Sequence, residues 1–402
     1  MSKKFKNGNM KLLKEFATRQ KLDLYYQLFS ALPEPDTILA ENNYDYNIYR
    51  DLLTDPHLMS TIQQRKMQVL QMELEVNHTD EKLKSKAIEL INNLPLSKVM
   101  GEILDCVFFG MSIGEIEWKK INDELVPVDV VSKPQEWFIF NRDNELRLRK
   151  RINGSYVFEE GEKLPDFKFI VSRYHPTYTN PYGEKILSRC YWAVTFKRSG
   201  VEFWQVMMEK FGMPYLIGRY PPSATEPDKD SLLENLELMI ENQTAVFPDS
   251  TVIEIKESPQ YDIGQLYENL AKFHNNEVSK AVLTVTLTTE LQGVGSYKAA
   301  EIHREMLEYL GITDKKIVEN AFNVLLEYYC YLNFGMTDAP KVVLRKKENV
   351  IEHSTERDKA LSEIGVRFTK EYFVKRYNLE ENEFVMGQTS DVKGQTESMI
   401  KD

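Results

Sequence analysis

The sequence predicts an α+β protein in which a unit of helices and antiparallel sheet carries a hairpin of two long helices. Three observations predict this class. Apolar residues recur at helical spacing before residue 110, and the pattern alternates at every second residue from 113 to 174. Two long helical stretches then enclose a short strand–helix–strand segment. A last long helix, with a kink at Gly311, completes the predicted fold.

The first part of the chain is predicted to be helical. Residues 1–30 are basic at first and lack the apolar centre of a secretion signal, so we predict an N-terminal arm and no export. Apolar spacing then predicts helices over 47–70, with a start or break at Pro56, and over 82–91 and 99–109.

Short antiparallel strands are predicted to follow these helices. Between residues 113 and 174, aromatic and β-branched residues alternate with polar ones, and Asn-Asp, Asn-Gly and Glu-Gly pairs interrupt the pattern as turn signals. The helices and this meander together predict one helix-plus-sheet unit.

A long helix is predicted from the Asn180-Pro181 turn to the Gly-Met-Pro sequence at 212–214. Strand-like runs at 215–220 and 244–257 then flank an acidic helix, and a second long helix follows. Such a hairpin holds a small unit away from the main body. A ring of subunits that lines a passage can use this shape, whereas a single enzyme domain rarely needs it.

A glycine-rich loop, TLTTELQGVGSYK, follows the second long helix and contains Gly293 and Gly295. It lacks the G-x-x-x-x-G-K-[ST] spacing of a phosphate loop, and no third glycine supplies the G-x-G-x-x-G spacing of a dinucleotide loop. We therefore interpret it as a flexible polar connection. A helix over 297–333, a strand KVVLRK, a helix over 354–365 and a polar tail, which we expect to be disordered, complete the chain.

Composition excludes several classes of function. The 402 residues are 42% hydrophobic and 28% charged, and no window reaches the apolar length of a membrane span. The three cysteines lie far apart in apolar or aromatic surroundings, which indicates buried thiols and not a disulfide or zinc framework. The net charge of −11 is opposite to that of a protein that grips nucleic acid tightly.

The sequence offers few candidates for catalysis or metal binding. Glu301, His303 and Glu305 have a spacing that points the histidine away from both carboxylates on a helix. His274 and Glu277 share a helical face, but no third ligand is near them in the sequence. A G-x-S-x-G motif is absent. We therefore predict no enzyme activity, no catalytic residue, no metal and no cofactor.

Two clusters of side chains allow alternative interpretations. The basic run contains Arg142, Arg147, Arg149, Lys150 and Arg151. It could contact DNA, but a solvated strand face or ion pairs with a neighbouring subunit are favoured. The aromatic run contains Tyr191, Trp192, Phe196, Phe203 and Trp204. It could line a ligand pocket, but packing between adjacent helical hairpins is favoured.

Four separated segments resemble the portal proteins of Mu-type tailed bacteriophages in matching order. They are PYGEKILSRCYWAVTFKRSGVEFWQVMMEKFGMPYLIGRY, the acidic helix DKDSLLENLELMIEN, AVFPDSTVIEI and SKAVLTVTLTTELQGVGS. The resemblance covers about residues 175–335, with weaker agreement upstream. It implies a phage portal fold with a helix-plus-antiparallel-sheet wing, a two-helix stem, a small α/β clip and a long kinked wing helix.

The resemblance implies a division of the chain into named parts. These are an N-terminal arm (1–30), a wing (31–183 and 297–347), stem helices (184–213 and 261–285), a clip (214–260), a channel loop (286–296) and a short C-terminal or crown region with a disordered tail (348–402). Members of the family often continue further, so the sequence alone does not establish a full crown.

The same resemblance implies a function and partners. Twelve copies would form a channel at the capsid vertex for packaging and ejection of double-stranded DNA, with weak and non-specific DNA contacts. The implied partners are the large terminase subunit, a head-completion or neck protein and the major capsid protein, with no membrane. The implied location is the virion, after assembly in the bacterial cytoplasm. The alternative is a non-enzymatic adaptor without a DNA channel.

Site residues are assigned from the resemblance to two regions. The DNA-facing loop residues would be Thr286, Thr288, Thr289, Gln292, Gly293, Gly295, Ser296 and Lys298. The clip residues that dock partners would be Arg219, Asp228, Lys229, Asp230, Glu234, Glu237 and Glu241. Small neutral side chains in the loop can touch a phosphate backbone weakly, and each phosphate held by a lysine or arginine would instead oppose movement of the DNA.

Overall fold

The computed structural model describes most of the chain. The described residues are 31–32, 34–152, 155–156, 161–211, 215–219, 222–242, 252–256, 263–285, 296–346 and 352–377. The chain packs into two units, Met1–Leu70 with Leu74–Leu344, and Gln71–Glu73 with Arg345–Asp402. Each unit is described by itself below.

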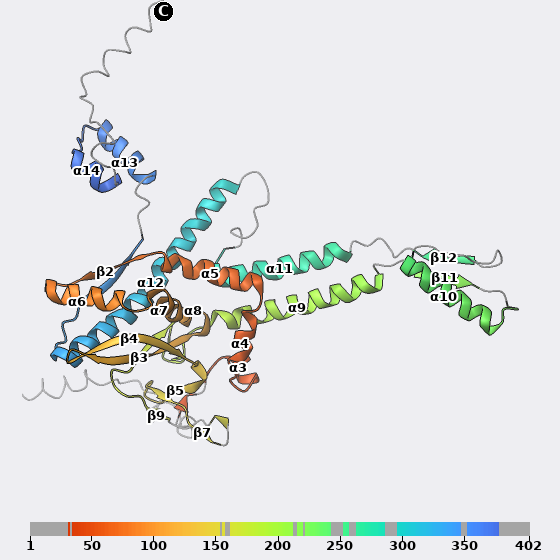
Figure 1. Cartoon of the computed structure of the whole chain (residues 1–402), viewed down its shortest axis with the longest axis horizontal. Coiled ribbons are helices and arrows are strands. Elements are labelled where there is room, and N and C mark those ends of the chain that lie inside the picture. Colours follow the sequence, from red (N-terminus) through yellow and green to blue (C-terminus); the bar gives the residue numbers. More distant parts are fainter. Residues whose placement is uncertain are drawn as a thin grey trace, which may run out of the picture. The chain divides into compact units, whose positions relative to one another are not determined.

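Helices form most of the first unit (Figure 1). They are α3 (Thr37–Glu41), α4 (Asn47–Leu52), α5 (Pro56–Leu70), α6 (Glu81–Asn92), α7 (Leu96–Leu104), α8 (Cys106–Phe109), α9 (Ile186–Phe211), α10 (Glu226–Asn242), α11 (Ile263–Leu283) and α12 (Ser296–Phe334). Aspartates Asp36 and Asp80 cap α3 and α6, since each carboxylate accepts two backbone N–H groups of the first turn.

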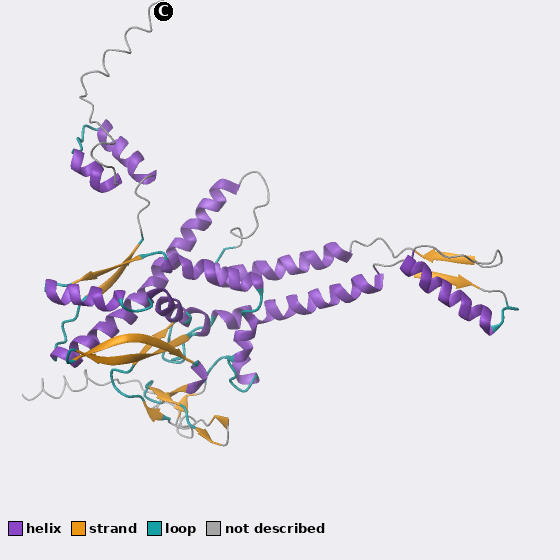
Figure 2. Cartoon of the chain, viewed as in Figure 1, coloured by secondary structure: helices purple, strands orange, loops and turns teal. Residues whose placement is uncertain are grey.

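The strands form small antiparallel sheets, of which β3 with β4 is the most extended pair (Figure 2). They are β1 (Ala31–Leu32), β2 (Glu73–Asn77), β3 (Met111–Ile121), β4 (Glu124–Lys133), β5 (Phe138–Asn141), β6 (Leu146–Leu148), β7 (Arg151–Ile152), β8 (Ser155–Tyr156), β9 (Glu162–Lys163), β10 (Phe169–Arg173), β11 (Tyr215–Arg219), β12 (Val252–Lys256) and β13 (Lys341–Arg345). A 3-10 turn, Gln135–Trp137, precedes β5.

Two of these sheets contain most of the strands of the first unit. One has the order β10-β3-β4 and the other β1-β5-β6-β9. A bulge between Glu117 and Trp118 shifts the register of β3 on β4. Two further pairs, β13 with β2 and β11 with β12, join segments that are distant in the sequence. Antiparallel strands are thus present over 113–174 as predicted, but among the described residues they form separate sheets and not one meander, because β10 pairs back with β3 and β5 pairs with β1.

The core lies where α4, α5, α8, α9 and α11 meet. Its fully buried side chains include Tyr49, Leu58 and Phe108. All three cysteines are free and buried, as the sequence predicted. Burial raises the pKa of the Cys190 thiol to about 12, so this sulfur stays protonated and unreactive at neutral pH.

Two backbone segments cross closely where one leads into β3 and the other leads into α9. Gly110 and Gly183 both have positive φ, +87° and +82°. A Cβ at Gly110 would lie 2.8 Å from the Tyr182 carbonyl oxygen, and one at Gly183 would lie 2.7 Å from the Tyr174 carbonyl oxygen. Only glycine meets both constraints, because it tolerates positive φ and adds no atom at the contact.

The C-terminal unit contains α13 (Glu352–Glu363) and α14 (Lys370–Tyr377). Both Tyr372 and Tyr377 donate hydrogen bonds from their hydroxyls to the buried carboxylate of Asp358, at 3.0 and 2.7 Å. The sequence predicted a helix over 354–365 but missed α14, because the segment is short and mostly charged.

Some predicted elements differ from the structure in their limits. The predicted helix over 99–109 is two helices, α7 and α8, which are separated at Asp105. The helix around 47–70 is likewise α4 and α5, because Pro56 begins a new helix as its fixed φ allows. At Gly311, where the sequence predicted a kink, helical structure continues without interruption.

One buried ion pair connects four segments of the first unit. Arg65 of α5 donates from Nε to Asp314 Oδ2 of α12 at 2.7 Å and from Nη2 to Asp314 Oδ1 at 3.1 Å. Its Nη1 donates to the Val282 carbonyl in the last turn of α11 at 2.8 Å, and Nη2 also reaches the Tyr174 hydroxyl at 3.1 Å. Both charged side chains are at most 2% exposed.

We predict that Arg65→Met lowers the free energy of unfolding by about 3–5 kcal/mol, because it leaves the Asp314 carboxylate buried without its partner. Urea unfolding followed by tryptophan fluorescence measures this loss in the first unit, which contains all four tryptophans. The control is Lys120→Met, which removes an exposed ion pair with Asp123 and is expected to cost less than about 1 kcal/mol. Equal urea midpoints for Arg65→Met and Lys120→Met would contradict a stabilising role for the buried Arg65–Asp314 pair.

Candidate subunit interface and channel site

The long hairpin consists of α9 and α11, which run side by side (Figure 1). The first half of α9 is buried through Ile186, Leu187 and Val194, and the second half of α11 is buried through Val278 and Val282. The remaining halves carry mostly exposed side chains. The hairpin is therefore rooted in the core at one end only.

Ion pairs hold the root of α9 to the surrounding helices. Just before α9, Lys185 donates to Glu34 Oε1 at 2.5 Å, with both groups buried. Lys197 pairs with Asp55 Oδ2 at 2.5 Å and also donates to Asn275 Oδ1 of α11 at 2.8 Å. Because these cations are largely desolvated, their carboxylate partners are required to offset the cost of burial.

The two helices approach each other closely at a glycine. A Cβ added at Gly200 of α9 would lie 2.8 Å from Leu270 Cδ2 of α11. One turn further along α9, Trp204 stacks on Tyr267 with ring centroids 6.4 Å apart and an interplanar angle of 7°. The absent side chain at Gly200 thus permits the close contact, and the aromatic pair extends it beyond the core.

One side of the hairpin exposes apolar side chains from both helices. They are Trp192, Phe196, Phe203 and Val206 of α9 with Leu266, Leu270 and Phe273 of α11. Fully burying one side chain of this size contributes about 1.5–3 kcal/mol. Contiguous apolar patches of this kind mark interaction surfaces. Of the aromatic residues that the sequence singled out, Trp192, Phe196 and Phe203 lie on this exposed side. Tyr191 instead packs against the core, and Trp204 stacks on Tyr267 of α11.

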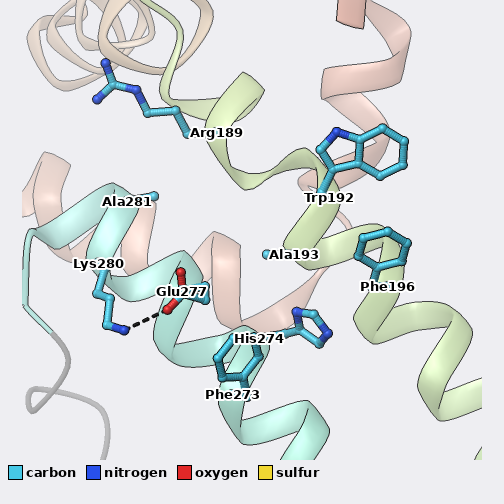
Figure 3. A pocket seen from close by; sticks show the side chains of 9 residues that line it. All are labelled: Arg189, Trp192, Ala193, Phe196, Phe273, His274, Glu277, Lys280 and Ala281. Atoms are coloured by element: carbon cyan, nitrogen blue, oxygen red, sulfur yellow. Dashed lines mark hydrogen bonds and ion pairs between the residues drawn. The ribbon is translucent and has the colours of Figure 1, made fainter.

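A groove of about 490 Å³ opens between the helices on this side (Figure 3). Trp192 stacks on Phe196 at 5.4 Å, and His274 lies between Phe196 and Phe273. At the edge of the groove, Lys280 donates to Glu277 Oε1 at 2.7 Å. The groove thus has aromatic walls and a polar rim.

His274 is the titratable side chain that lies between the aromatic rings of the groove. Burial lowers the pKa of its imidazole below the ordinary value, and the positive charge of Lys197 lowers it further, while Glu277 acts in the opposite direction. The neutral imidazole is therefore favoured at neutral pH. A neutral, flat side chain suits a groove that another apolar surface covers.

The tip of the hairpin is a small α/β unit made of β11, β12 and α10. Tyr215 pairs with Lys256 and Arg219 with Val252 in the antiparallel register. A Cβ at Gly218 would lie 3.0 Å from side-chain atoms of both Leu232 and Leu236, so α10 packs directly on β11. The predicted strand over 244–257 is described only as β12, because residues 243–251 and 257 lie outside the described residues.

The predicted partner-docking residues lie together on this tip. Asp230, Glu234 and Glu237 are exposed and share one face of α10 by their spacing. Asp228 instead accepts from the Thr225 backbone N–H at 2.8 Å and hydroxyl at 2.6 Å, which caps the helix and lowers the pKa of Asp228. Lys229 pairs with Glu226.

Arg219 is exposed at the end of β11. Glu241 belongs to α10, but its side chain lies outside the described residues.

The predicted channel loop falls almost entirely outside the described residues. This holds for Thr286, Thr288, Thr289, Gln292, Gly293 and Gly295. Ser296 is the first residue of α12 and Lys298 lies in its first turn, but their side chains are also outside the description. The structure describes the two helices that flank the loop, with α11 ending at Leu283.

The basic run does not form one strand face. Arg142 follows β5, Arg147 lies in β6 beside Glu145, with which it forms an ion pair, and Arg151 begins β7. Lys150 follows β6 without joining a strand. Arg149 is only 8% exposed, so the interpretation of a solvated face is wrong for this residue. The alternation fails because β6 ends at Leu148.

Among the residues that the structure describes, no group of three histidine, cysteine or carboxylate side chains could hold a metal ion. His274 and Glu277 lie in the same groove, as their spacing predicted. The side chains of Glu301 and His303 lie outside the description, whereas Glu305 is exposed.

The architecture defines the fold class of this chain, which is the α+β portal fold. It is similar to the neck of an empty gene transfer agent particle computed with C6 symmetry, at TM-score 0.58 and 11% identity over 80% of this chain and 90% of that one. It is also similar to the neck of a native particle computed with C12 symmetry, at TM-score 0.56 and 10% identity over 86% and 94%. The predicted α+β portal fold is confirmed.

Sequence comparison narrows the class to a family. Residues 46–379 match the family described as the portal protein of Mu bacteriophage, and the chain belongs to this family. It is 26% identical to the portal protein of Escherichia phage Mu over 63% of this chain and 50% of that protein. It is 23% identical to the Mu-like prophage FluMu protein gp29 of Haemophilus influenzae over 63% and 49%. The chain spans about half the length of these curated relatives.

Sequence reasoning missed the buried polar residues that hold the hairpin in place. Arg65 shares its helical face with Leu58, Ile62 and Val69, all of which are buried. A single charge at a core-facing position of an amphipathic helix is the available signal, because such a charge needs a buried partner. The sequence could not identify Asp314 as that partner.

Substitution of Gly200 tests the close contact between α9 and α11. We predict that Gly101→Ala in α7, where a Cβ meets no atom within 4 Å, stabilises the protein by about 1 kcal/mol through helix propensity. Gly200→Ala should fall short of this gain by about 1 kcal/mol, because the Leu270 side chain must move away from the added methyl group. Urea unfolding of both variants measures the difference, and equal gains would show that the helices are not in close contact.

Proposed function

We propose that this chain is a portal subunit, copies of which form a ring-shaped channel for double-stranded DNA at a capsid vertex. The observation that carries this proposal is the rooted hairpin of α9 and α11 with a compact tip, in a chain of the Mu portal family. In this proposal α9 and α11 are the stem, and β11, α10 and β12 form the clip. The body is the wing, and residues 286–296 form the channel loop.

A ring accounts for the exposed apolar side of the hairpin. In an isolated chain this side is open to water, whereas neighbouring copies would cover it. The similar neck structures, computed with C6 and C12 symmetry, support a rotational arrangement, and we propose twelve copies.

None of the helices in the described residues is long and apolar enough to cross a membrane.

Movement of DNA through the ring is consistent with the charge of the chain. Each lysine or arginine that holds a phosphate adds an electrostatic barrier that recurs along the duplex. A net charge of −11 per chain lowers those barriers around the whole ring. We propose that the neutral residues of the loop, Thr288, Thr289 and Gln292, touch the backbone weakly and in passing.

The tip is proposed to dock the large terminase subunit during packaging and the head-completion or neck protein afterwards. The major capsid protein would contact the wing. In this proposal the ring assembles in the bacterial cytoplasm, becomes part of the virion and catalyses no reaction. The second candidate is a non-enzymatic adaptor without a channel, which would have the mass of a monomer and not that of a ring.

The ring and its channel loop are tested together. We expect the purified protein to have about twelve times the 47.0 kDa of one chain in multi-angle light scattering. Replacing Gly293 and Gly295 by proline should leave this mass unchanged but reduce the yield of DNA-filled heads, because proline removes the glycine hinges. A monomeric wild type would refute the ring. Normal yields of filled heads from the variant would refute the loop assignment.

Charge reversal on α10 tests the docking function of the tip. Changing Asp230, Glu234 and Glu237 to lysine should abolish capture of the phage's own large terminase subunit in a pull-down while the ring mass is retained. The matched control changes Glu305, Glu363 and Glu371 to lysine, which are also exposed and alter the net charge equally. Unchanged capture by the α10 variant would show that its acidic face does not dock the terminase.

A further inference from the structure

The outer half of α9 exposes apolar side chains on two opposite sides. On one side lie Phe203 and Val206, which are 64% and 54% exposed. On the other lie Val201 and Met208, at 39% and 59%. At 100° per residue, Val201 and Met208 lie about 140–180° around the helix from Trp192 and Phe203.

The second long helix occupies the side of α9 between these two apolar faces. Gly200 and Trp204 mark that side, because Gly200 faces Leu270 and Trp204 stacks on Tyr267. The helix α11 therefore leaves both apolar faces of α9 open. The apolar pattern goes beyond what pairing of α9 with α11 requires.

Two different exposed faces on one helix fit a particular kind of assembly. A two-fold dimer buries the same surface of both copies, whereas a ring built by rotation joins one surface to a different surface of the next copy. Rotation about an axis along the hairpin also keeps equivalent residues at the same height. Phe203 and Val206 lie within a few residues of Val201 and Met208, so the two faces of neighbouring copies meet at one level.

We infer that α9 is the contact helix between copies, with Phe203 and Val206 of one chain packed against Val201 and Met208 of the next. This inference rests on the proposed ring and assigns the surface that joins its stems. The groove beside Trp192 and Phe273 continues the first face toward the root, where the neighbouring copy covers His274. The polar rim of Glu277 and Lys280 is already paired within its own chain, so the contact requires no new charge pair there.

Disulfide trapping tests this pairing. The double variant Phe203→Cys with Met208→Cys places one thiol on each face, and these two positions lie on opposite sides of α9, so they cannot bond within one chain. The three native cysteines are buried and do not compete. After oxidation, denaturing gels should show a ladder at multiples of the 47.0 kDa chain. Each single variant should stay at the mass of one chain, because neither face meets its own equivalent.

A second pair and a control keep the test independent of one substitution. Val206→Cys with Val201→Cys should form the same ladder. Leu233→Cys with Ile364→Cys, at positions that are 58% and 77% exposed on α10 and just after α13, should not. A disulfide-linked dimer from a single α9 variant would overturn the inference in favour of a two-fold contact.

Light scattering on the oxidised and reduced samples separates this inference from the proposed function. A ring mass without a ladder in either α9 pair overturns the contact assigned to α9 and leaves the portal proposal standing. A monomer mass for the wild type at every concentration overturns both. A ring mass with ladders from both α9 pairs and none from the control supports the assignment.

Discussion

The buried guanidinium of Arg65 is the contact on which the placement of the long helices depends. It joins α5 to the end of α11 and to the middle of α12, and it also reaches the tyrosine that follows β10. A charge at this depth is costly unless its donors are used, and here Nε, Nη1 and Nη2 each have an acceptor. Its contact with the last turn of α11 also places a positive charge where the helix dipole is negative. The geometry of the hairpin root follows from satisfying this one group.

Two buried lysines at the root of the hairpin are also paired with carboxylates. Lys185 and Lys197 are buried next to Glu34 and Asp55, so the hairpin is held by paired charges on either side of the apolar core. Burial raises the pKa of Glu34, and the adjacent ammonium of Lys185 opposes that rise. Such pairs have strict geometric requirements. They therefore fix the direction in which α9 leaves the core, which apolar packing alone would fix less sharply.

Local periodicity was sufficient to predict most of the longer elements and their order, although it missed β2 and α14. The apolar repeat of the long helices, the alternation of β3 and β4, and the turn residues between strands are all visible over short windows of sequence. Contacts between distant segments were not predictable in this way. The pairing of β2 with β13 and of Arg65 with Asp314 depends on tertiary packing, to which sequence spacing gives no guide.

The sequence suggested that aromatic residues of α9 pack against a neighbour, but it did not show which sides of the helix are exposed. Aromatic residues on both sides of α9 indicated packing with a neighbour, yet only the structure shows that α11 covers the side marked by Gly200 and Trp204. The basic run at 142–151 was interpreted as one face of a continuous strand. That interpretation fails because β6 ends at Leu148. Assignments that depended on family resemblance alone, such as the loop at 286–295, lie outside the described residues and remain proposals.

The length of α12 makes it a lever. Asp314 is anchored near its middle, and the helix continues toward its N-terminus for another 18 residues, about 27 Å at 1.5 Å per residue. A rotation of about 5° at the anchor therefore displaces the first turn by roughly 2 Å. A small change in tilt at a rigid pivot is thus converted into a much larger displacement at the start of the helix.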